Sequence, residues 1–128
     1  MRILLDTCTF LWILGDSPQL SVRAREAFAA AESEVYLSAA SAWEIAVKHR
    51  LGRLPLPEAP ELFVPAQRKA HGIEPLPVDE ESALHVALLP DLHRDPFDRM
   101  LVAQAMLHGL ALLTPDDALR RYAVRTLW

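Results

Sequence analysis

The sequence has 128 residues and a hydrophobic content of 52%, which suits one globular domain with a single core and excludes a disordered chain. The formal net charge is −4, so the chain is not a protein that coats nucleic acid by bulk positive charge. Cys8 is the only cysteine, and no apolar run approaches the roughly 18–20 residues of a membrane span, so we expect a cytoplasmic protein without disulfides or a membrane partner.

Strands and helices are predicted to alternate along the first half of the chain. Apolar runs, capping residues and turn residues divide it into a strand at 2–6, a helix at 7–14, a helix at about 22–32, a strand at 35–37, a helix from Ser38 or Ser41 to about Leu51, and a helix at about 60–70. Gly15, Gly52 and Gly72 are the expected stops of three of these helices.

The second half continues the alternation. It contains a strand at 73–78, a helix from Asp79 to about Leu89, a helix from Asp95 to His108, a strand at 110–114, a short helix at 116–121 and a last strand at 123–127. Pro75 and Pro77 predict an edge position for the 73–78 strand, because proline has no backbone N–H to donate to a neighbouring strand. The whole pattern predicts an α/β fold with a parallel sheet covered on both faces.

Carboxylates stand at the ends or starts of several of these elements. They are Asp6, Glu44, Asp95, Asp98 and Asp116. The carboxyl ends of parallel strands lie at one edge of a sheet, where ligands bind, so acids far apart in sequence can meet there. Clustered carboxylates repel one another unless protons or a metal neutralise them. The pattern therefore predicts a site for Mg²⁺ or Mn²⁺, whose preferred ligands are oxygens and which can activate water in phosphodiester hydrolysis.

Each acid taken alone has a simpler interpretation as a helix-capping residue. Asp6, Asp95 and Asp116 precede predicted helices, and Asp98 is favoured by the helix dipole near the start of its own. Glu44 completes a capping box with Ser41, an interpretation that fails if the helix already starts at Ser38. Capping is the favoured role for Asp95, and both roles are open for Asp98. The joint arrangement is harder to explain by capping.

Four segments resemble the PIN-domain family, and in particular its VapC toxins of type II toxin–antitoxin systems. They are LLDTCTFLW at 4–12, SAASAWEIAVK at 38–48, HRDPFDRMLVAQA at 93–105 and LTPD at 113–116. The resemblance implies one PIN-like domain over residues 1–128, built as a three-layer α/β/α sandwich with a mainly parallel sheet. It also implies an Mg²⁺- or Mn²⁺-dependent endoribonuclease.

The resemblance assigns roles to particular residues. The family's acids fall on Asp6, Glu44, Asp98 and Asp116: Asp6 and Asp98 would hold the principal metal, Glu44 would be a further ligand or orient the attacking water, and Asp116 would support a second metal or a water. The supporting positions include Thr7 and Thr114, whose hydroxyl groups lie beside the acids, and Asp95, which is typical of the subgroup. Arg99 is also a supporting position. Its side chain either orients an acid such as Asp95 or forms an ordinary surface ion pair. Pro115 can shift Asp116 away from its family position.

The resemblance also implies partners. They are an RNA substrate, a cognate antitoxin whose C-terminal segment lies across the active site, a second copy in a homodimer, and operator DNA bound only through the antitoxin in a toxin–antitoxin hetero-oligomer. The apolar residues Phe10, Leu11 and Leu14 are compatible with an interface. Candidate phosphate contacts are Arg50, Arg53, Arg94, Arg120 and Arg121. Most histidines are interpreted as surface residues, although His93 could contact substrate.

Two other functions remain open from the sequence. Asp6 could be the nucleophile of a phosphatase-like phosphoryl transferase, although the D-x-D pattern of haloacid dehalogenases is absent because Cys8 stands two residues after Asp6. The chain could also be a catalytically silent interaction domain. The presence of all four acids counts against that alternative.

Overall fold

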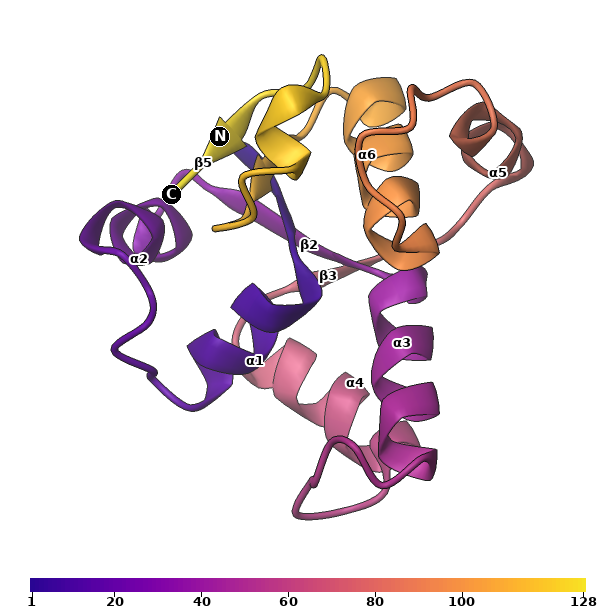
Figure 1. Ribbon diagram of the computed structural model, residues 1–128. Coiled ribbons are helices and arrows are strands. Elements are labelled where there is room, and N and C mark those ends of the chain that lie inside the picture. Colours follow the sequence, from indigo (N-terminus) through magenta and orange to yellow (C-terminus); the bar gives the residue numbers. More distant parts are fainter.

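The computed structural model describes residues 1–128 and contains one sheet in which every pairing is parallel. The strands are β1 (Arg2–Leu5), β2 (Glu34–Ser38), β3 (Glu74–Leu76), β4 (Ala111–Leu113) and β5 (Thr126–Leu127), in the spatial order β3-β2-β1-β4-β5 (Figure 1). The two prolines predicted an edge position for the 73–78 strand correctly, since β3 is an outer strand. The α/β class is confirmed.

Six α-helices connect the strands. They are α1 (Thr7–Leu14), α2 (Val22–Ala29), α3 (Ala39–Arg50), α4 (Pro60–Ala70), α5 (Glu80–Val86) and α6 (Pro96–His108), with a short 3₁₀ turn η1 (Leu119–Arg121) before β5. Gly109 follows α6 with a φ of 64°, a left-handed conformation that glycine adopts without steric cost.

Three predicted helices end or begin differently from the sequence-based expectation. The second helix ends at Ala29 rather than near residue 32, because Ala30 already has extended backbone angles. The helix after Asp79 ends at Val86, because the N–H groups of Leu88 and Leu89 bond to carbonyls three residues earlier and form tight turns instead. The predicted helix at 116–121 is wrong in its first part: the Asp116 carboxylate accepts from the Ala118 N–H at 2.8 Å, which makes a turn, and only η1 follows.

Side chains of β1 alternate between two hydrophobic clusters on opposite faces of the sheet. Ile3 and Leu5 pack in one cluster with residues of α1, α2, α3 and α4, whereas Leu4 packs in the other with residues of α6. Figure 1 shows the helices on the two sides of the sheet. The three-layer sandwich is therefore confirmed. Phe10 is fully buried in the first cluster, so it is a core residue and is not exposed for an interface.

The strand register sets the position of the acids. Leu5 pairs with Leu113, so Asp6 and Thr114 follow the ends of two neighbouring strands and lie side by side. The Asp6 N–H also donates to the Leu113 carbonyl at 3.1 Å, which continues the ladder by one residue. None of the helices combines the length and the apolar character that crossing a membrane requires.

Candidate functional site

A cavity of about 560 Å³ lies at the carboxyl edge of the sheet. All five acids that the sequence singled out line it: Asp6, Glu44, Asp95, Asp98 and Asp116. Two cationic side chains, Lys48 and Arg53, also line it. The acids come from the end of β1, from α3, from the start of α6 and from the turn after β4. The parallel topology thus brings these residues to one place.

Asp6 is held by a hydroxyl group rather than by the helix that follows it. Its backbone has the extended angles of a capping residue, but its side chain makes no capping bond to α1. Instead, the Thr114 hydroxyl donates to Asp6 Oδ2 at 2.6 Å, so the capping interpretation of this side chain is wrong. Only 6% of Asp6 is exposed, and burial raises the pKa of its carboxyl, helped by the nearby charges of Glu44 and Asp116.

Glu44 lies in the second turn of α3 and points into the same cavity. The helix begins at Ala39, and the Ser38 hydroxyl caps it by accepting from the Ala40 N–H at 3.0 Å, so the capping box with Ser41 does not form. The Thr7 hydroxyl donates to Glu44 Oε1 at 2.7 Å, and its oxygen lies 2.8 Å from the Ser41 hydroxyl. Glu44 is therefore oriented by a residue of α1.

Lys48 was not among the residues expected at the site. It forms an ion pair with Glu44 one helical turn earlier, and this hydrogen bond raises the pKa of the Lys48 ammonium. A glutamate followed four residues later by a lysine is the spacing at which the two side chains meet on a helix. That spacing was the signal that could have predicted Lys48.

Asp95 and Asp98 occupy the first turn of α6. The Asp95 carboxylate accepts from the Phe97 N–H at 2.8 Å, so Asp95 caps the helix as expected, while it also lines the cavity. The Asp98 side chain is 15% exposed. Burial, with the charges of Asp6 and Asp95 nearby, raises the pKa of Asp98 to about 7.

Thr114 connects the acids on the other side of the cavity. Its hydroxyl is fully buried, donates to Asp6, and accepts from the Asp116 N–H at 3.1 Å. Asp116 Oδ1 accepts from Ala118, and its Oδ2 lies 2.9 Å from His93 Nε2. Pro115 does not remove Asp116 from the cavity wall.

His93 was expected only as a candidate substrate contact, but it lies among the acids. Its Nε2 is 2.9 Å from Asp116 Oδ2 and 3.3 Å from Asp98 Oδ2. The sequence signal for this placement is weak, because it depends on how the loop before α6 folds back toward Asp116.

Arg99 does not reach Asp95 or any other acid of the cavity. Its guanidinium group donates to three backbone carbonyls, those of Val86, Leu89 and Pro90, and to the Tyr122 hydroxyl at 3.1 Å. It also pairs with the exposed Asp91 at 3.7 Å. Of the two roles left open for Arg99, the orienting contact is not formed and the ion pair with a surface acid is. Arg99 also holds the turn between α5 and α6.

The arginines proposed for phosphate contact are not all near the acids. Arg53 lines the acidic cavity, whereas Arg50 lines a separate cavity between α3 and α4. Arg120 forms an ion pair with Asp117 at 3.6 Å. Within the cavity, the positive side chains are therefore Lys48 and Arg53.

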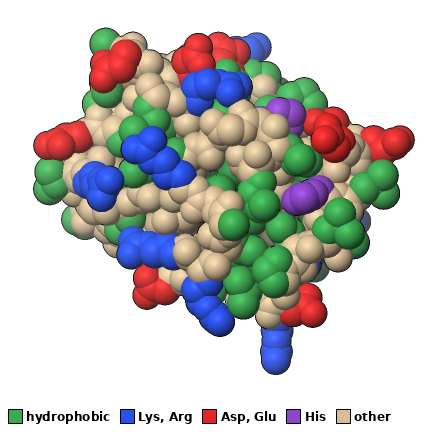
Figure 2. All heavy atoms as spheres, turned by 90° about the horizontal axis from the view of Figure 1, so that it is seen from above, with side chains coloured by type: hydrophobic (Ala, Val, Ile, Leu, Met, Phe, Trp, Pro, Cys, Tyr) green, Lys and Arg blue, Asp and Glu red, His purple; other side chains and the backbone are tan.

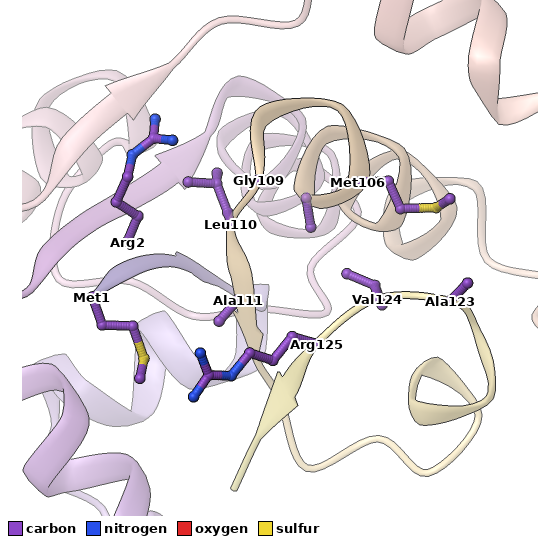
Figure 3. A pocket seen from close by; sticks show the side chains of 10 residues that line it. Met1, Arg2, Met106, Gly109, Leu110, Ala111, Ala123, Val124 and Arg125 are labelled. Atoms are coloured by element: carbon purple, nitrogen blue, oxygen red, sulfur yellow. The ribbon is translucent and has the colours of Figure 1, made fainter.

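A further cavity of about 510 Å³ lies at the opposite edge of the sheet, where β1 and β4 begin. Figure 3 shows that its lining side chains come from the start of β1, the end of α6 and the segment that leads into β5, with Arg2 and Arg125 among them. No carboxylate lines this cavity. The two ends of the sheet are thus chemically different, and the acids gather at the carboxyl edge.

The donors in the acidic cavity suit a hard divalent cation. Carboxylate oxygens are the ligands that Mg²⁺ and Mn²⁺ prefer, and a bound cation would offset both the burial and the repulsion that raise the pKa of Asp98. Cys8 also lines the cavity, but burial raises the pKa of its thiol to about 12, so it stays protonated and does not offer a thiolate. The carboxylates that line the cavity, those of Asp6, Glu44, Asp95, Asp98 and Asp116, are therefore the candidate ligands.

The fold and this arrangement of acids agree with a comparison to known families, in which the model of the PIN domain matches residues 3–125. The chain belongs to the PIN domain family. A curated relative, Ribonuclease VapC16 of Mycobacterium tuberculosis, is 47% identical over 53 residues. The matched stretch covers 41% of this chain and 38% of that protein.

Solved structures with the same PIN fold cover almost the whole chain. VapBC2 from Rickettsia felis, bound to a DNA fragment from its promoter, has a TM-score of 0.74 at 12% identity and matches 99% of this chain and 98% of its own. DNA-bound VapBC from Salmonella typhimurium has a TM-score of 0.67 at 19% identity and matches 99% of this chain and 97% of its own. At these identities the likeness establishes the fold.

Proposed function

We propose that this chain is a metal-dependent endoribonuclease and the toxin of a type II toxin–antitoxin pair. The observation that carries the proposal is the gathering of Asp6, Glu44, Asp98 and Asp116 around one cavity of a PIN domain. The partial identity to Ribonuclease VapC16 supports the reaction class, and the likeness to VapBC structures is consistent with the biological role.

Asp6 and Asp98 would hold the principal Mg²⁺, or Mn²⁺, with Glu44 as a further ligand or as the group that orients the attacking water. Asp116 would support a second ion or a water. When bound, the cation would activate that water and stabilise the charge that develops on the phosphodiester. No side-chain nucleophile is required by this assignment.

The hydroxyl groups beside the acids would prepare the site before RNA binds. Thr114 donates to Asp6 and Thr7 donates to Glu44, and each bond fixes one carboxylate oxygen. Both threonines are buried, so these bonds are shielded from competing water. Lys48 and Arg53, on the cavity wall, would contact the substrate phosphates.

The proposed partners follow from the same family role. We propose that the chain forms a homodimer and binds a cognate antitoxin in a hetero-oligomer, and that it reaches operator DNA only through that antitoxin. Exposed apolar side chains are available for such interfaces, including Trp43 at 65%, Leu84 at 66% and Leu88 at 77% exposure. Figure 2 shows hydrophobic side chains gathered on the part of the upper face where α5 and α6 lie.

Incubation of the purified chain, free of antitoxin, with structured RNA tests the function directly. We expect cleavage products in the presence of Mg²⁺ or Mn²⁺ and none with excess EDTA, because the acids alone cannot activate water. Cleavage that persists in EDTA would contradict metal dependence. Release of phosphate from small monoesters without RNA cleavage would favour the phosphoryl transferase, and no reaction with either substrate would favour the silent domain.

A further inference from the structure

The surroundings of the His93 ring decide whether its Nε2 is a metal ligand or a hydrogen-bond donor. Its Nε2 lies 2.9 Å from Asp116 Oδ2 and 3.3 Å from Asp98 Oδ2, and these three atoms are close enough together to surround a metal ion. A histidine and two aspartates can form a metal site, with the imidazole nitrogen as a ligand through its lone pair. The alternative is that Nε2 carries a proton and donates to Asp116 Oδ2, with Asp98 Oδ2 close to the same N–H.

The other ring nitrogen distinguishes these alternatives. The backbone N–H of Asp95 donates to His93 Nδ1 at 3.0 Å. A backbone amide can only donate, so Nδ1 must carry the lone pair. A neutral imidazole has one N–H, which is then on Nε2 and faces the oxygens of Asp98 and Asp116.

We propose that His93 is a positioning residue of the nuclease site, whose Nε2–H bridges the two acids by donating to Asp116 Oδ2 at 2.9 Å and lying 3.3 Å from Asp98 Oδ2, and that it is not a metal ligand. The inference rests on the proposed function for its catalytic consequence. The two aspartates come from separate elements, α6 and the turn after β4. An N–H directed between them offsets the repulsion between the two carboxylates.

The loop that presents His93 is itself fixed. The Tyr122 hydroxyl accepts from the backbone N–H groups of Leu92 and His93, at 3.2 Å and 3.0 Å, and Arg99 donates to the same hydroxyl at 3.1 Å. Tyr122 is 4% exposed, so this anchor is buried. Arg99 therefore supports the acids through Tyr122 and His93 rather than by direct contact.

The bridge also distributes the carboxylate oxygens. Both oxygens of Asp116 accept protein hydrogen bonds, one from His93 and one from Ala118. Asp98 uses Oδ2 toward His93, and no protein donor reaches its Oδ1. Asp98 thus keeps an oxygen directed by the bridge and available to a cation, as its role as a principal ligand requires.

Nitrogen NMR of the histidine side chains tests the tautomer without any activity measurement. At a pH of about 8, above the ordinary imidazole pKa of about 6.5, long-range ¹H–¹⁵N spectra separate protonated from unprotonated ring nitrogens. We expect His93 to carry its proton on Nε2 and to keep it when Mg²⁺ is added. A proton on Nδ1, or direct Nε2 coordination on adding Mg²⁺ or Mn²⁺, would overturn the proposal.

Two substitutions test the consequence for the site. Glutamine can supply an N–H donor near the position of Nε2, whereas alanine supplies none. We therefore expect His93→Gln to keep the Mg²⁺ affinity within about threefold of the wild-type value. We expect His93→Ala to lower it about 10–100-fold, the range for residues that orient metal ligands. Calorimetric titration with Mg²⁺ measures both, and thermal melting confirms that each variant is folded. His85→Ala, on α5, is the matched control and should change neither the Mg²⁺ affinity nor the melting temperature.

The outcomes separate this inference from the proposed function. Equal affinity of all three proteins for Mg²⁺, or failure of glutamine to restore what alanine loses in a folded protein, would overturn the bridging role. A chain that shows the Nε2–H tautomer and the glutamine rescue of Mg²⁺ affinity but cleaves no RNA would leave the bridge in place and contradict the nuclease proposal.

Discussion

Asp98→Asn and Asp6→Asn are each expected to reduce RNA cleavage about a thousandfold or more. Asparagine keeps the shape of aspartate, but its neutral oxygen binds a divalent cation weakly, and residues of one catalytic unit are each close to indispensable. In the Asp6→Asn variant the side-chain amide oxygen can still accept from Thr114, so we expect the fold to persist. Measured rates of RNA cleavage at saturating Mg²⁺ check the prediction, with Asp117→Asn as a control because Asp117 is a neighbouring but exposed acid outside the cavity.

Asp98→Asn should at the same time stabilise the metal-free protein. The folded state keeps the proton of Asp98 up to a pH of about 7, whereas the unfolded state loses it near pH 3.8. The stability that the protonated carboxyl contributes is therefore lost as the pH rises through about 7. Removing the charge at pH 8 should raise the free energy of unfolding by roughly 2–4 kcal/mol. Lost activity with a lower melting temperature would instead indicate damage to the fold.

The affinity for Mg²⁺ should rise about tenfold between pH 6 and pH 8. Asp98, with a pKa of about 7, is mostly protonated at pH 6, and a cation must displace that proton to bind. Burial also raises the pKa of Asp6, which acts in the same direction. Above pH 7 the Asp98 contribution levels off.

Calorimetric titration in buffers of different ionisation enthalpy measures this linkage. We expect release of about one proton per cation from Asp98 at pH 6 and close to none at pH 8. An affinity that does not change over this range, without proton release, would contradict the assignment of Asp98 as a ligand with a raised pKa.

The order of strands and helices could be predicted from the sequence because its signals are local. Apolar runs, glycine stops and the caps Ser21, Asp79 and Asp95 each act within a few residues, and each of these side chains does accept a capping bond. The errors have equally local causes that sequence patterns resolve poorly. Asp116 uses its carboxylate for a tight turn, and the second helix ends at Ala29 because Ala30 is already extended. Of the two starts that the sequence left open for α3, the structure has the one at Ser38.

The meeting of the four acids was predictable from topology and from family resemblance, but their partners were not. Parallel strands bring their ends to one edge, which places Asp6 beside Thr114 whatever the rotamers. The contacts of His93 and Arg99 depend instead on how the loop before α6 folds onto Tyr122, some thirty residues away in sequence. Such side-chain contacts have no periodic signature.

Anomalous diffraction from crystals soaked in Mn²⁺ tests the central claim, that the acids form one metal site, most directly. We predict a Mn²⁺ peak in the cavity at the carboxyl edge of the sheet, within coordination distance of carboxylate oxygens of Asp6 and Asp98 and not of His93 Nε2. The absence of a peak there at saturating Mn²⁺, or a peak only at exposed acids elsewhere, would contradict the account.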